Sequence, residues 1–261
     1  LNVHGSDVMN EGVFMRWFNK RCLLKSSLII VPSEYFKTVM QKRYNFLHAS
    51  DIFVSPSGGI DSSLFYNIET TMQHNKNKIF NLGFVSRIDQ GKGWQLFLHL
   101  INYLNSRGYL INGIIIGDGK QRDLMLKCIM KLNIESCIQY RGLVEQKYLV
   151  QSFNKFDLFI FPTLLNESLG LVGIEAMTCG VPVIASNIGG PSGYIIDQRN
   201  WFLFEPGNIN DLIEKVLYYF KLSKADQYKI IENAISTSKR YQSSKVIKNL
   251  SKKIKDYVQE A

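Results

Sequence analysis

Two cations in one loop of this chain have the types and spacing to hold a phosphorylated ligand. Arg87 and Lys92 stand five residues apart in the glycine-bearing segment SRIDQGKG, directly after an apolar run. An arginine can grip a phosphate through two parallel hydrogen bonds and a lysine adds a compact charge, so the pair suits a diphosphate. An ordinary exposed turn between a strand and a helix is the alternative interpretation.

Two carboxylates, Glu167 and Glu175, enclose the almost wholly apolar stretch SLGLVGI. We expect a helix over residues 169–178, with Glu167 ahead of it and Glu175 nearly two turns inside. The acid and base of a glycosidase face each other within about 10 Å, whereas these side chains point about 80° apart and are displaced along the axis. We therefore expect them to contact different parts of one extended ligand; a helix N-terminal Glu and a surface Glu are the structural alternative.

The turn before this helix is a further candidate for binding an anion. The N–H groups that open a helix have no partner inside it, and the helix dipole adds to their attraction for negative charge. We expect these free groups at Ser168, Leu169 and Gly170. Glu175 lies among apolar residues and needs hydrogen-bond donors to stay buried, which ribose hydroxyls would supply.

These candidate residues follow segments that have the pattern of strands. Short apolar runs alternate with amphipathic segments of about ten residues, which indicates βαβ units and a parallel sheet covered on both faces. Strands are expected at 27–31, 51–55, 79–85, 111–116, 138–141, 158–161, 183–185 and 201–204. Helices are expected at 33–44, 94–106, 120–132, 145–153, 169–178 and from 210 onward. The class is α/β with Rossmann-like topology, in which ligands bind at the carboxyl ends of the strands.

The polar segment ETTMQHNKN, residues 69–77, has no strand pattern and predicts a linker. It would separate residues 1–70, an incomplete domain whose half sheet leaves an unpaired edge, from a complete Rossmann-like domain over residues 71–240. Residues 241–261 predict a C-terminal helix that packs back on the N-terminal part.

The composition indicates a globular protein without a membrane span. Because 46% of the 261 residues are hydrophobic and 12% are aromatic, the chain can bury a core, which excludes a disordered tail. No apolar run approaches the ~18–20 residues of a membrane span. The four cysteines show no CxxC spacing, which favours reduced thiols over a disulfide or zinc framework and predicts a cytoplasmic protein.

The net charge of +9 is concentrated in a lysine-rich segment over residues 221–255. A solvated helix face is the plain interpretation. The alternatives are a polyanionic substrate or a peripheral contact with an anionic membrane, which would place the protein at the inner face of that membrane. Nucleic acid is not expected as a partner, because no basic stretch is interleaved with aromatic residues as in a stacking platform.

Several motifs, taken in order, resemble retaining glycosyltransferases of family four, which have the GT-B fold. The resemblance to their C-terminal domain rests on SRIDQGKG, IIGDGKQRDL, DLFIFPTLLNESLGLVGIEAMTCGVPVIASNIGGPSG and EPGNINDLIEKV. VHGSD, SLIIVPSEYFKTVM and VSPSGGIDSSLF resemble the last portion of the N-terminal domain. The resemblance implies that the N-terminal domain, incomplete here, binds the acceptor, while the C-terminal domain binds a sugar nucleotide.

The resemblance also implies roles for the candidate residues. Arg87 and Lys92 would hold the diphosphate and stabilise the departing charge without a metal, in keeping with the lack of any Asp-x-Asp sequence. Glu175 would hold the ribose. Glu167, with the N–H groups that follow it, would contact the transferred sugar and support an oxocarbenium-like transition state.

Two more residues enter only through the resemblance. His4, in VHGSD, matches a family histidine that approaches the donor sugar, and the backbone around Leu143 would meet the base. The implied metal-independent activity is transfer of a hexose from a nucleotide-diphosphate sugar, UDP favoured, to a glycan or lipid-linked acceptor. Assembly of bacterial surface polysaccharide, lipopolysaccharide or capsule, is the expected pathway, with no cofactor beyond the donor. A non-catalytic sugar-nucleotide-binding subunit and a GT-B nucleotide-sugar epimerase are the alternatives.

Overall fold

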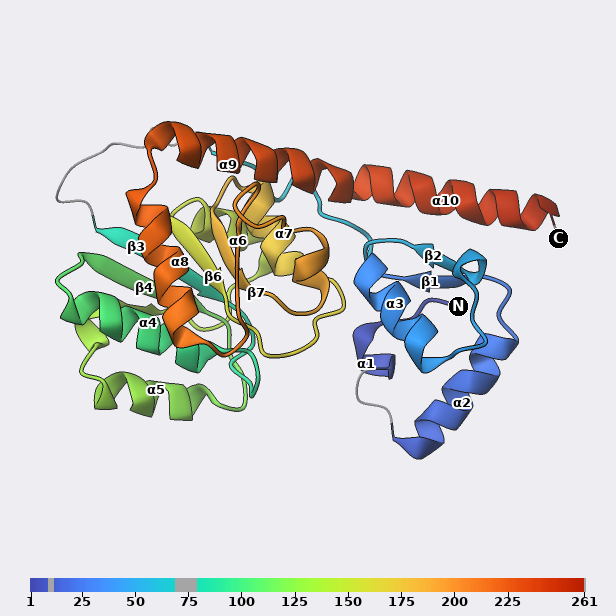
Figure 1. Ribbon diagram of the computed structural model, residues 1–261, viewed down its shortest axis with the longest axis horizontal. Helices are drawn as coiled ribbons and strands as arrows, with labels where there is room; N and C mark the ends of the chain where they lie inside the picture. Colours follow the sequence, from blue (N-terminus) through green and yellow to red (C-terminus); the bar gives the residue numbers. More distant parts are fainter. Residues whose placement is uncertain (9–11, 69–78, 261) are drawn as a thin grey trace.

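Two parallel β-sheets organise the chain, one of six strands and one of two (Figure 1). The computed structural model describes residues 1–8, 12–68 and 79–260, so the predicted linker at 69–77 lies outside the described residues. The larger sheet follows this gap and the smaller one precedes it. Each sheet has its own hydrophobic cluster, and the cluster around the six strands is far larger.

The strands of the six-stranded sheet are all parallel, in the order β5-β4-β3-β6-β7-β8. They are β3 (Phe80–Val85), β4 (Ile111–Ile116), β5 (Ile138–Tyr140), β6 (Leu158–Phe161), β7 (Val183–Ser186) and β8 (Phe202–Phe204). Their Val-, Ile- and Phe-rich sequences suit a sheet that is covered on both faces. The chain first adds strands on one side of β3 and then continues on its other side with β6, so the order reverses between these two neighbours.

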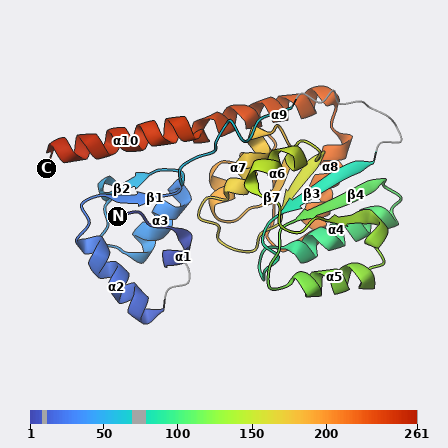
Figure 2. The ribbon, with the colours of Figure 1, turned by 180° about the vertical axis from the view of Figure 1, so that it is seen from behind.

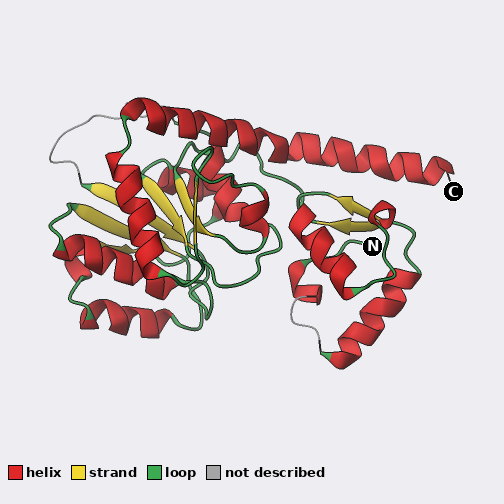
Figure 3. Cartoon of the chain, in the orientation of Figure 1, coloured by secondary structure: helices red, strands yellow, loops and turns green. Residues whose placement is uncertain are grey.

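Helices cover both faces of this sheet (Figure 3). They are α4 (Trp94–Ser106), α5 (Arg122–Lys131), α6 (Gln146–Phe153), α7 (Leu171–Thr178), α8 (Ile209–Lys221) and α9 (Lys224–Ser238). Helix α4 packs against α5 and α8 on one face, while α6 and α7 lie on the other (Figures 1 and 2). Short 3₁₀ helices are η1 (Ala49–Asp51), η2 (Glu135–Cys137), η3 (Gly190–Gly193) and η4 (Lys239–Tyr241).

The N-terminal part holds a small parallel sheet with three helices around it. Its elements are α1 (Gly5–Val8), α2 (Val13–Leu24), β1 (Ile29–Val31), α3 (Glu34–Arg43) and β2 (Ile52–Val54). The Ser33 hydroxyl accepts a hydrogen bond from the Phe36 N–H at 3.0 Å and so caps the start of α3. The last helix, α10 (Ser243–Glu260), runs from the larger unit along this smaller one (Figures 1 and 2).

The sequence pattern located most of the larger unit well. Helix α4 and strands β4 and β6 have the predicted bounds. Gly180 follows the end of α7 at φ +71°: its N–H donates to the Met177 carbonyl, and the Val181 N–H donates to the Ala176 carbonyl. All four cysteines are free thiols. None of the helices within the described ranges combines the length and apolar character needed to cross a membrane.

Candidate functional site

A cavity opens where the strand order reverses between β3 and β6. In open parallel sheets the loops that leave two such strands diverge and form a crevice at their carboxyl ends. Here those loops also touch: at Gly93, φ +80°, an added Cβ would lie 1.8 Å from the Pro162 oxygen, so only glycine permits the contact. The cavity has a volume of about 370 Å³. It is lined by Ser57, Val85, Ser86, Arg87, Lys92, Phe161, Glu167, Ser168, Leu169, Gly170, Leu171 and Val172.

Lys92 and Glu167 form an ion pair inside this cavity. The Lys92 Nζ lies 2.6 Å from the Glu167 Oε1, and the Thr163 hydroxyl donates to the same oxygen at 3.1 Å. The Lys92 and Glu167 side chains are only 13% and 20% exposed, so water screens their attraction weakly. A phosphate that enters the cavity would compete with Glu167 for the lysine, and the carboxylate would then be released toward the rest of the ligand.

Arg87 is the second cation at the cavity and differs from Lys92 in exposure. Its side chain is 72% exposed and pairs with Asp89, Nη1 to Oδ2, at 3.0 Å. Exposed ion pairs of this kind contribute at most about 1 kcal/mol. Arg87 can therefore leave Asp89 for a ligand phosphate at little cost.

The helix after Glu167 starts later than expected. Helix α7 begins at Leu171, so the expectation of a start near Ser168 or Leu169 is wrong. Gly170 has φ +81° and ψ 54°, a left-handed conformation that interrupts the helix before it can include the preceding residues. The positive end of α7 still faces the cavity, because Gly170, Leu171 and Val172 line it.

The segment before α7 is held in place by the loop after β7. The Gly190 N–H donates to the Glu167 carbonyl at 2.6 Å. An added Cβ at Gly190 would lie 2.4 Å from the Leu169 Cα, so this contact also requires glycine. Leu169 is only 3% exposed and packs into the hydrophobic core, so its side chain anchors the segment. The cavity wall from Glu167 to Gly170 is therefore held by the backbone hydrogen bond to Glu167 and by the buried side chain of Leu169.

Glu175 lies deeper, outside the set of cavity-lining residues. It is 8% exposed, and burial raises the pKa of its carboxyl group, an effect that a hydrogen bond from Gln146 partly opposes. The Gln146 Nε2 donates to the Glu175 Oε1 at 3.3 Å. A carboxylate has room for about four hydrogen bonds, so Glu175 retains capacity for further donors. Glu167 and Glu175 thus have partners on different elements, the loop after β3 and helix α6.

The N-terminal unit contacts the residues on either side of Glu167. The Tyr35 hydroxyl donates to the Asn166 Oδ1 at 2.8 Å, and the Ser33 hydroxyl donates to the Ser168 carbonyl. No motif in the sequence indicated these partners, nor Thr163, Gln146 or Ser57. The contacts join residues that are 131 and 135 positions apart, and no local pattern signals such a pairing.

Six of the nine predicted site residues line the cavity: Arg87, Lys92, Glu167, Ser168, Leu169 and Gly170. His4 is exposed and lies outside the lining set, although its neighbour Gly5 approaches Ser168 so closely that an added Cβ would be 3.1 Å from the Ser168 Cβ. Leu143 is 78% exposed in the loop after β5 and is also outside the set.

This arrangement suits a ligand with an anionic centre. One poorly exposed lysine, one movable arginine and the start of α7 supply positive potential at one point. Glu167 supplies one carboxylate beside them, paired with Lys92. Within the part of the chain that the structure describes, no group of three or more His, Cys, Asp or Glu side chains is arranged to hold a metal.

Comparison with known proteins shows what the chain is similar to. The model of the family described as glycosyl transferases group 1 matches residues 68–237. An uncharacterized glycosyltransferase of Methanocaldococcus jannaschii is 28% identical over 220 residues, which cover 83% of this chain and 57% of the relative. The capsular polysaccharide biosynthesis glycosyltransferase CapM of Staphylococcus aureus is 26% identical over 167 residues, 61% of this chain and 43% of CapM. The chain thus spans about half the length of these two relatives.

Solved structures show the same fold. The Anabaena protein HepE, crystallised in complex with UDP-glucose, aligns with a TM-score of 0.81 at 19% identity, over 98% of this chain and 71% of that structure. At this identity the likeness establishes the α/β architecture of parallel sheets flanked by helices, which confirms the fold class predicted from the sequence.

Proposed function

We propose a function from one premise: the chain belongs to the family of group 1 glycosyl transferases. Its activity would be transfer of a hexose from UDP-sugar to a glycan or lipid-linked acceptor, with retention at the anomeric carbon, as in glycosyltransferases of family four. The observation that carries the proposal is the Lys92–Glu167 pair, which lies in the cavity between β3 and β6 beside the start of α7.

The cations are assigned to the diphosphate. Lys92 would exchange Glu167 for a phosphate oxygen, and Arg87 would swing from Asp89 to the same group. The positive end of α7 adds to this potential. Together these groups would stabilise the charge on the departing UDP, which is the role that a metal ion has in other transferases, so the proposed reaction is metal-independent.

The carboxylate released from Lys92 is assigned to the sugar. Glu167 would face the anomeric carbon, where positive charge develops as the bond to the diphosphate breaks, and stabilise it. Glu175 would accept ribose hydroxyls, the Leu143 backbone would meet the base, and His4 would approach the sugar from the N-terminal unit. Because Glu175, Leu143 and His4 do not line the cavity between β3 and β6, these roles require a ligand that reaches beyond it or a change in the position of the three residues.

The relatives support the donor and the pathway of the proposal. HepE was crystallised with UDP-glucose, and CapM is described as an enzyme of capsular polysaccharide biosynthesis. We therefore propose a UDP-sugar as donor and bacterial surface polysaccharide as product, made on the cytoplasmic side of the membrane. The net charge of +9 would favour anionic acceptors and membrane surfaces.

Calorimetric titration of UDP, UMP and uridine tests the assignment of the phosphate site. Lys92→Ala should weaken UDP binding by about 10- to 100-fold, the range expected for a charged hydrogen bond, and should change uridine binding much less. Lys127→Ala, an exposed lysine on α5, is the matched control and should leave both unchanged. Equal losses for UDP and uridine would remove the phosphate assignment, and GDP and ADP in the same titration identify the preferred base.

Turnover tests the assignment of the carboxylate. Glu167→Gln keeps the size of the side chain but removes its charge, so sugar transfer should fall far more than UDP-sugar affinity. Activity should persist in EDTA. Unchanged turnover in the variant, or complete metal-reversible loss in EDTA, would contradict the mechanism proposed here.

A further inference from the structure

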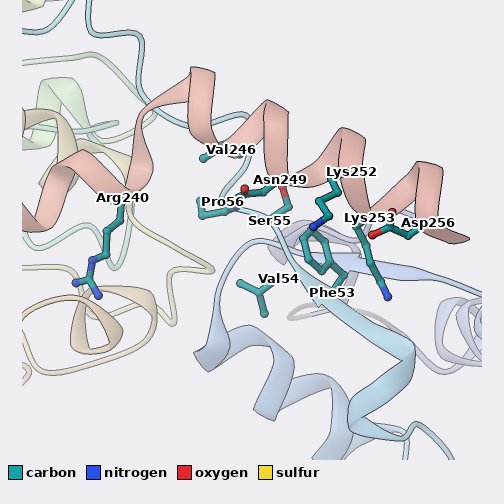
Figure 4. A pocket seen from close by; sticks show the side chains of 10 residues that line it. All are labelled: Phe53, Val54, Ser55, Pro56, Arg240, Val246, Asn249, Lys252, Lys253 and Asp256. Atoms are coloured by element: carbon teal, nitrogen blue, oxygen red, sulfur yellow. The ribbon is translucent and has the colours of Figure 1, made fainter.

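A second cavity lies between helix α10 and the end of β2 (Figure 4). Its volume is about 380 Å³, similar to that of the cavity between β3 and β6. One wall is the segment Phe53–Pro56, and the other is the face of α10 that carries Asn249, Lys252 and Lys253. Nothing in the proposed donor site uses this space.

Backbone hydrogen bonds hold the two walls together at one end. The Ile60 N–H donates to the Tyr241 carbonyl at 2.7 Å, and the Ser243 N–H donates to the Ile60 carbonyl at 2.9 Å. Gly59, at φ +79°, permits this approach, because an added Cβ would lie 2.6 Å from the Tyr241 oxygen. The start of α10 is therefore fixed against the loop after β2, and the cavity between them is a stable feature of the fold.

The lining of this cavity has excess positive charge. Arg240, Lys252 and Lys253 contribute cations, and Asp256 contributes the one acidic group. None of the three cations forms a salt bridge with another residue in the described ranges. Lys252 and Lys253 extend from α10 toward the β2 side, and Arg240 lies toward the other end (Figure 4). Unneutralised charges of one sign in a concave site attract a ligand of the opposite sign.

The other lining groups suit a sugar that bears the anion. The Ser55 hydroxyl and the Asn249 amide can donate hydrogen bonds to hydroxyl or phosphate oxygens. Phe53 and Pro56 add apolar surface on the opposite wall. A few polar groups set against apolar surface are the usual composition of a small-molecule site.

The loop after β2 joins this cavity to the donor cavity. Pro56 lines the second cavity, and the next residue, Ser57, lines the donor cavity. We propose that the cavity between α10 and β2 binds the phosphate of a phosphate-bearing sugar, and, on the premise of the proposed function, that this sugar belongs to the acceptor. The cavity between β3 and β6, as donor site, and the cavity between α10 and β2, as anion site, would then hold two phosphorylated ligands on either side of the loop after β2.

Titration of α-D-glucose 1-phosphate into protein saturated with UDP tests the site, because UDP occupies the donor cavity. Replacing Lys252 and Lys253 together by Ala should weaken this binding at least about tenfold. The matched control replaces Lys248 and Lys255, two exposed lysines of α10 outside the cavity, and should change it less than about twofold. Methyl α-D-glucoside, which lacks the phosphate, should not bind to the unmodified chain or to either double variant.

Three results would overturn the proposal. They are no binding of glucose 1-phosphate to the unmodified chain, equal weakening by the two double variants, and equal binding of the neutral glucoside. The first shows that there is no site, the second that the whole of α10 attracts anions without a specific site, and the third that the phosphate is not recognised.

The proposed function can fail separately from this site. If UDP does not bind but glucose 1-phosphate binding still depends on Lys252 and Lys253, the donor assignment is lost and the anion site stands. Sedimentation with phosphatidylcholine vesicles, with and without phosphatidylglycerol, distinguishes the source of the phosphate. Binding to anionic vesicles that glucose 1-phosphate displaces would identify a lipid headgroup, and lack of sedimentation would identify a soluble sugar phosphate.

Discussion

The two units of this molecule are stabilised in different ways. The six-stranded unit encloses a large continuous core in which β6 and β7 are buried along their whole length. The N-terminal unit has two short strands and a much smaller cluster, and the aromatic residues Phe14, Trp17 and Phe18 of its helix α2 are about half exposed or more. Since buried apolar area is the main source of stability, the larger unit should hold most of it.

The two candidate sites reflect this difference. The cavity between β3 and β6 is formed almost wholly by residues of the six-stranded unit, and the N-terminal unit adds Ser57 and the contacts of Ser33 and Tyr35. The cavity at α10 instead depends on both units, because β2 forms one wall and α10 the other. Donor binding should therefore tolerate damage to the N-terminal unit, whereas binding at α10 should not.

The largest effect is expected from a truncation in the larger core. Phe159 is fully buried on β6, with its ring 5.6 Å from that of Phe153 and 6.5 Å from that of Phe156. Phe159→Ala should lower the free energy of unfolding by about 3–5 kcal/mol, because it leaves a cavity that β6 cannot close. Urea denaturation measures this loss. The control Leu143→Ala, at a 78% exposed position, should change it by less than about 0.5 kcal/mol.

A matched truncation in the smaller core should act locally. Phe36 is fully buried on α3 within the N-terminal cluster, and Phe36→Ala should cost about 3 kcal/mol in that unit. Hydrogen exchange should then show lost protection of β1 and β2 amides, with β3 and β6 amides and the stabilisation by UDP largely kept. Equal loss of protection in both sheets would show that the two units unfold as one.

A smaller effect is expected from Glu175, which should make the stability of the fold depend on pH. Burial raises its pKa above the ordinary value of 4.5, so the folded chain holds this proton at a pH where the unfolded chain has released it. Stability should therefore fall as pH rises from 4.5 through the raised pKa. Glu175→Gln should remove that fall. Thermal unfolding of both proteins across this range measures it, and parallel curves would exclude Glu175 as the cause.

The smallest effect is expected at the contact between the units. Tyr35→Phe removes the hydrogen bond to Asn166 and should change the free energy of unfolding by about 1 kcal/mol or less. Amides from Glu167 to Gly170 should nevertheless exchange faster, because the N-terminal unit no longer holds the flanking residue. Tyr228→Phe, on an exposed side chain of α9, is the control. If both variants leave the exchange unchanged, the N-terminal unit does not position Glu167.

Prediction from the sequence was more complete for the larger unit than for the N-terminal unit. In the larger unit, buried strands and amphipathic helices have strong local periodicity, and α4, β4 and β6 were located to the residue. In the N-terminal unit, helix α2 was missed: most of its large apolar residues are exposed, so it does not show the polar outer face that marks an amphipathic helix. The start of α7 was misplaced for another reason: the left-handed Gly170 interrupts an otherwise uniform apolar run.

The sequence by itself determined a parallel α/β sheet and the residues that follow its strands, because periodicity and turn chemistry are local. That information was enough to select six residues that line one cavity. Only the tertiary structure decided that Lys92 pairs with Glu167, 75 positions away, and that Tyr35 reaches Asn166. Such contacts depend on strand order and on the packing of one unit against another. A stretch of sequence does not contain its distant partner, so these contacts appear only once the whole chain is folded.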